Sequence, residues 1–136
     1  MDNTSKALRI FLTLAGLFTL FAGGFHALAG VGGDWFIGLE SPESINPSLD
    51  SQNRFYGAAF LLYGILLIYC ARELRRHADI LKIAFATMFL AGCVRSLAVL
   101  TYGWPTWQVS ALWFTEIVLP PIAWLWLNHN VKEPTD

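Results

Sequence analysis

Ionisable side chains within or beside long apolar stretches are the residues of this sequence best suited to chemistry. Arg95 and Glu116 lie inside apolar runs, and Arg54 stands at the start of another. A charged side chain costs about 2.5–3.5 kcal/mol at the centre of a membrane, so each should have a partner or face water. A guanidinium donates two parallel hydrogen bonds to a carboxylate or phosphate. These residues therefore favour a site for an anionic head group.

Other polar side chains fall near the same end of the apolar runs. The predicted ligand-binding residues are Asp50, Asn53, Arg54, Arg95, Glu116, His26 and Tyr102. The alternative interpretation is a salt-bridge network that only holds the helices together. The sequence shows no catalytic triad, metal-ligand spacing, pair of haem histidines or phosphate-binding loop. No metal or cofactor is therefore expected, and the chain is not predicted to be an enzyme.

The composition indicates the elements that must position these residues. The 136 residues are 55% hydrophobic and only 14% charged, against about 25% charged in soluble domains. Four apolar runs approach the roughly 20 residues that cross a bilayer. The sequence predicts an all-α integral membrane four-helix bundle, in which all 136 residues form one membrane domain. The expected helices span about 8–29, 54–71, 80–102 and 108–127, with a long loop over 30–53.

The distribution of Lys and Arg predicts the orientation of these helices. Basic residues precede the first run, flank the link at 72–79 and follow the fourth run, whereas the segment 30–53 carries acidic residues. The positive-inside rule therefore places both termini in the cytoplasm. The first run resembles a signal peptide with a cleavage site, but its length favours a retained helix. Arg54 then lies at the outer edge, where positive charge is depleted.

Chain spacing predicts which inner charges meet. Arg95 and Glu116 are ten and eleven residues from Pro105, at the centre of a short turn. A rise of 1.5 Å per residue brings both to a similar depth of roughly 10–13 Å. We expect them to pair. We expect Arg54 to lie higher, at the mouth, and to share Glu116 with Arg95, and Asp50 could neutralise the positive charge that is left over. Small residues such as Gly23 and Gly57 should allow close helix contacts.

The long loop has two interpretations. The segment 35–39 is too apolar for a free loop, so it is expected either to anchor in the membrane interface or to cover an outward-facing pocket. Asp50 or Ser51 is expected to cap the second helix.

Three strings give the chain a family likeness: LDSQNRFYGAAFLLYG, AGCVRSLAVLTYG and TEIVLPP. They resemble an uncharacterised family of small four-helix bacterial inner-membrane proteins, a domain of unknown function related to the DoxX-like group. The resemblance implies a four-helix fold in a bacterial membrane. It marks Asp50, Asn53, Arg54, Arg95 and Glu116, and it transfers no established activity.

The leading hypothesis is a multi-pass protein of the bacterial inner membrane that binds an amphipathic anion or lipid in a pocket facing the periplasm, in a transport-associated or other envelope role. One alternative is a structural or accessory subunit of an envelope or transport complex, with an envelope protein as partner. Another is a quinone-associated redox subunit. A homotrimer or homodimer is expected, and the net charge of −1 gives no indication of a nucleic-acid partner.

Overall fold

Four long helices make up the computed structural model, which describes residues 3–40 and 44–131. The order is α1 (Asn3–Ala29), the 3-10 helix η1 (Gly30–Ile37), α2 (Pro47–Ala71), α3 (Ala78–Tyr102) and α4 (Trp107–Val131). All four long helices are apolar and long enough to cross a membrane. The prediction of an all-α four-helix membrane fold is confirmed.

Helix α2 begins seven residues earlier than the predicted start at residue 54. Asn46 precedes it in an extended conformation, and its side-chain oxygen accepts hydrogen bonds from the backbone N–H groups of Ser48 and Leu49, at 2.9 and 3.4 Å. Pro47 follows at the first helical position, where a missing N–H costs nothing. The expectation that Asp50 or Ser51 caps this helix was therefore wrong, because both lie inside its first turns.

Glycines bring α1 and α2 into backbone contact. A Cβ atom on Gly23 would lie 2.7 Å from the carbonyl oxygen of Gly57, and one on Gly64 would lie 2.5 Å from that of Gly16. Both distances are shorter than any ordinary contact of a side chain. The expected close packing at Gly23 and Gly57 is confirmed, and the two helices form a tight hairpin.

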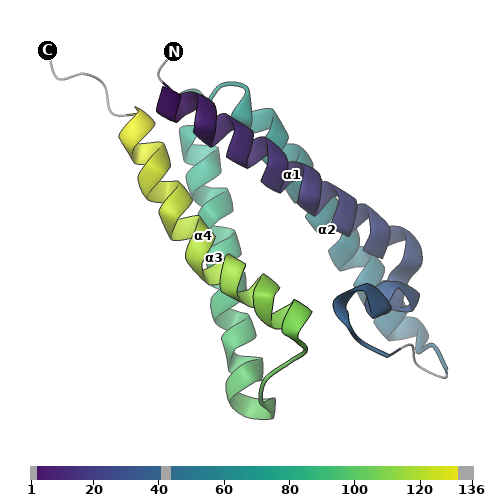
Figure 1. The fold of residues 1–136 in the computed structure, drawn as a ribbon. Coiled ribbons are helices and arrows are strands. Elements are labelled where there is room, and N and C mark those ends of the chain that lie inside the picture. The colour runs from purple at the N-terminus through teal and green to yellow at the C-terminus, as the bar shows by residue number, and fades with distance from the viewer. Residues whose placement is uncertain (1–2, 41–43, 132–136) are drawn as a thin grey trace, which may run out of the picture.

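The buried core lies at the end of the molecule that holds both termini of the described chain. Its members come from the start of α1 and α3, the end of α2 and α4, and the link between α2 and α3. They are Leu8, Leu12, Leu67, Cys70, Ala71, Leu74, Ala78, Leu81, Ala84, Phe85, Ala123 and Leu127. From this core the α1–α2 and α3–α4 hairpins diverge toward the opposite end (Figure 1).

Residues 30–40, here called the outer strap, link the two hairpins at the diverging end. Their aromatic side chains pack on α1: the rings of Trp35 and Phe36 lie 6.2 and 5.8 Å from that of Phe25. The hydroxyl of Thr106, in the turn before α4, donates to the carbonyl of Ile37 at 2.9 Å. The strap thus folds over the helix ends rather than forming a free loop.

Candidate functional site

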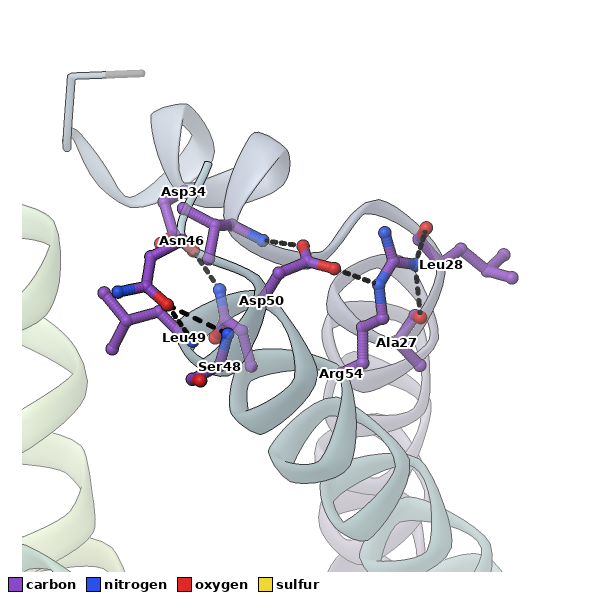
Figure 2. Close-up of polar contacts among 10 residues, drawn as sticks. Ala27, Leu28, Asp34, Asn46, Ser48, Leu49, Asp50 and Arg54 are labelled. Atoms are coloured by element: carbon purple, nitrogen blue, oxygen red, sulfur yellow. Dashed lines mark hydrogen bonds and ion pairs between the residues drawn. The ribbon is translucent and has the colours of Figure 1, made fainter. Parts of the chain in front are cut away.

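Arg54 is occupied by partners within its own hairpin (Figure 2). Its Nε lies 2.7 Å from Oδ2 of Asp50, one turn earlier on α2. Its Nη1 donates to the carbonyl oxygens of Ala27 and Leu28, at 3.2 and 2.5 Å. The last carbonyls of a helix have no partner within the helix, so Arg54 closes the end of α1. The expectation that Arg54 is held by a negative partner is confirmed by its contact with Asp50.

Asp50 fixes the start of the outer strap. Its Oδ1 accepts a hydrogen bond from the backbone N–H of Val31 at 3.0 Å. Gly30 turns the chain between α1 and η1 with a φ of 59°, a conformation that favours glycine. A Cβ on Gly30 would also collide with the Asp50 carboxylate. Asp50 and Arg54 therefore hold the junction of α1 with the strap.

A second contact set holds the middle of the strap. Asn53 donates from its side-chain amide to Oδ1 of Asp34 at 2.7 Å. Nε2 of His26 lies 3.5 Å from the same oxygen, and Nδ1 of His26 contacts the carbonyl of Ala22 at 3.0 Å. Asp34 was absent from the predicted site. It lies 19 residues before Asn53, so no helical or turn spacing could have linked the two in the sequence.

Arg95 and Glu116 form the second polar site, between α3 and α4. Nη2 of Arg95 donates to Oε1 of Glu116 at 3.1 Å, and Nε lies 3.0 Å from Oε2. The second approach lacks hydrogen-bond geometry, so Oε2 is buried with an ion-pair partner but no hydrogen bond from the described residues. The predicted pairing of Arg95 with Glu116 is confirmed.

The surroundings of this pair are tightly packed on one side. Glu116 sits over Gly92, where a Cβ would lie 3.0 Å from that of Glu116. The indole Nε1 of Trp113 donates to the hydroxyl of Ser96 at 2.9 Å and to the carbonyl of Gly92 at 3.2 Å. Trp113 was not predicted; its spacing of three residues before Glu116 is the signal that places both on one face of α4.

The two sites are separate, contrary to the expectation of one pocket. No hydrogen bond or ion pair within the described parts of the chain joins the Arg54 group to the Arg95 group. Asp50 neutralises Arg54, as expected under both interpretations. The expectation that Arg54 shares Glu116 was wrong, because its partners are Asp50 and the carbonyls of Ala27 and Leu28. Tyr102 joins neither group, because its position at the end of α3 leaves it 89% exposed.

An apolar hollow of about 370 Å³ lies between α3 and α4. Its lining residues are Phe85, Ala86, Phe89, Pro120, Pro121, Trp124 and Leu125. Phe89 and Arg95 are six residues apart, which places them about 120° apart around the helix. Neither Arg95 nor Glu116 is among the residues that line this hollow. Among residues 3–40 and 44–131, no three His, Cys, Asp or Glu side chains gather in a way that could hold a metal ion.

Comparison with known proteins gives a family and no function. No curated protein matches the chain, and no solved structure matches it. The model of a family described as a domain of unknown function, DUF4345, matches residues 7–127, which include every residue of the two polar sites. The chain therefore belongs to the DUF4345 family.

Proposed function

We propose that this membrane protein binds an amphipathic anion, with the acidic head on Arg95 and the apolar tail beside the helices. The observation that carries the proposal is the unused part of the Arg95 guanidinium. Nε and Nη2 face Glu116, whereas Nη1 has no partner within the described residues. The side chain of Arg95 is 36% exposed, against 8% for Glu116. A second anion can therefore approach Arg95.

The shape of α3 beside Arg95 supports room for a tail. Ala84 is buried, and its carbonyl accepts a hydrogen bond from Tyr63 of α2 at 3.2 Å. Ala91 and Ala98 follow at intervals of seven residues on the same face, and both are exposed. Away from the core, the α3–α4 hairpin diverges from the α1–α2 hairpin (Figure 1). The small side chains on this face of α3 favour an apolar chain lying against it.

The cellular setting is part of the same proposal. The excess of Lys and Arg before α1, in the link at 72–79 and after α4 favours cytoplasmic termini. The outer strap then faces the opposite side, which is the periplasm in the inner membrane of a bacterium. The diverging hairpins leave apolar surface for self-association, so a homodimer or homotrimer is proposed as well.

A second candidate function is that of an accessory or scaffolding subunit. The observation in its favour is the Arg54 network, whose donors and acceptors satisfy one another and serve to fasten the strap. In that case the ion pair of Arg95 and Glu116 only holds α3 and α4 together, and substitution at Arg95 would alter stability without releasing a ligand.

Native mass spectrometry of the protein purified in a mild non-ionic detergent tests the proposal. We expect a bound acidic lipid in the wild type and its loss in Arg95→Gln. The matched control is Arg76→Gln, which removes an exposed arginine in the link between α2 and α3 and should leave the lipid in place. Circular dichroism shows whether each variant is folded. Equal lipid content in all three proteins would refute the proposal and favour the accessory function.

A further inference from the structure

The charge balance at Arg95 limits how an anion can bind. One guanidinium and one carboxylate give the site no net charge. Glu116 is buried, and Arg95 from α3 is the charged side chain that contacts it. The described residues of α1, α2 and the outer strap place no other charged group against this carboxylate; His26 and Asp34 contact each other in the other hairpin. A second anion would therefore leave the site with one excess negative charge.

Such an excess is unfavourable away from water. Two anions that share one site in a low-dielectric region do not both stay ionised, because their repulsion and desolvation favour protonation of one. Glu116 is the more buried of the two candidates, since its side chain is 8% exposed, whereas the ligand would approach the 36% exposed side chain of Arg95. Its Oε2 accepts no hydrogen bond from the described residues. Protonation of Oε2 would therefore break no hydrogen bond. It would weaken the ion pair with Nε of Arg95, which lies 3.0 Å away.

We infer that an anion that binds Arg95 does so together with one proton, which Glu116 takes up. This inference rests on the proposed function. The proton comes from solvent and converts the carboxylate of Glu116 to a carboxylic acid. The guanidinium of Arg95 then forms its ion pair with the ligand, and release of the ligand returns the proton. The site holds one positive and one negative charge before and after binding.

Proton uptake makes the affinity depend on pH with a known sign. Binding strengthens as the pH falls, because the bound state holds one more proton than the empty state. Over the pH range in which Glu116 is ionised when empty and protonated when bound, the affinity falls by about tenfold for each pH unit gained. The protein would then bind its ligand more tightly on the more acidic side of a membrane.

Isothermal titration with decanesulfonate in a non-ionic detergent tests this inference, because the sulfonate stays charged at every pH used. For the wild type we expect an affinity that falls from pH 5.5 to 8 by about tenfold per unit over part of the range. Titrations in two buffers with different heats of ionisation should show uptake of close to one proton. Glu116→Gln should bind with an affinity independent of pH, near that of the wild type at low pH. Asp79→Asn, which removes an exposed carboxylate of α3, should keep the wild-type pH dependence.

The outcomes separate the two proposals. If the wild type binds decanesulfonate at no pH, or if Arg95→Gln binds it equally well, the proposed site fails and the inference fails with it. If Arg95→Gln loses binding while the wild type binds without proton uptake, the site stands and the inference is overturned. A pH dependence that persists in Glu116→Gln also overturns it. Should that variant not fold, the buffer comparison on the wild type decides the question.

Discussion

Alanine at Gly23 is expected to destabilise the α1–α2 hairpin, whereas alanine at the neighbouring Gly24 is not. A Cβ on Gly23 would lie 2.7 Å from the carbonyl oxygen of Gly57 and 2.8 Å from the carbonyl carbon of Phe60. A Cβ on Gly24 would meet only the end of the Leu61 side chain, at 3.6 Å. The two positions thus share a helix and a residue type and differ in the space available.

The expected magnitude follows from two opposing effects. The backbone nitrogen of Leu61 would be nearer still to a Cβ on Gly23, so the backbones of α1 and α2 would have to separate by roughly 1 Å to reach ordinary contact. Such overpacking costs about 1–3 kcal/mol. Alanine also favours the helix over glycine by about 0.5–1 kcal/mol. We therefore expect Gly23→Ala to lower the free energy of unfolding by about 1–2 kcal/mol and Gly24→Ala to raise it by up to about 1 kcal/mol.

Reversible unfolding in mixtures of a mild detergent and dodecyl sulfate, followed by far-ultraviolet circular dichroism, measures this difference. Gly57→Ala provides a test from the opposite helix, because its Cβ would lie 2.8 Å from the carbonyl oxygen of Gly23. Equal stability of Gly23→Ala and Gly24→Ala would show that the helices are not in backbone contact there, and the reasoning about this hairpin would be wrong.

Three further predictions concern the outer end, the α3–α4 contact and the orientation. Arg54→Gln and Asp50→Asn should each destabilise the protein, and the double variant should be little worse than either, as a double-mutant cycle of melting temperatures would show; additive losses would contradict the pairing. Trp113→Phe should lower the free energy of unfolding by about 0.5–1.5 kcal/mol, because the hydrogen bonds to Ser96 and Gly92 are lost. Chemical unfolding measures this change, and an unchanged stability would contradict the prediction. A reporter fused to the C-terminus should be cytoplasmic and one inserted beside Glu40 periplasmic, with a periplasmic C-terminus excluding the expected orientation.

The helices and the inner charge pair could be predicted because their signals are local or set by short connections. Apolar runs of about 20 residues define spans regardless of tertiary packing. Arg95 and Glu116 lie at similar distances from Pro105, and a short turn makes their helices antiparallel neighbours, so chain counting alone brings them together. Hydropathy failed at the start of α2 because Ser48–Asn53 is polar, although the Asn46–Pro47 pair is a helix start signal.

The separation of the two arginines could not be predicted, and its physical reason bears on function. Two partners of Arg54 are backbone carbonyls at the end of α1. Every residue type carries such a carbonyl, so these contacts leave no signal in a sequence. Because these carbonyls and Asp50 already bind the Arg54 guanidinium, its charge serves to hold the strap on α1. The string that spans Asp50–Arg54 and carries the family likeness thus specifies how the outer end of the hairpin closes. A ligand would instead have to be sought at Arg95. There Nη1 of a guanidinium inside a membrane span is left without a partner among the described residues.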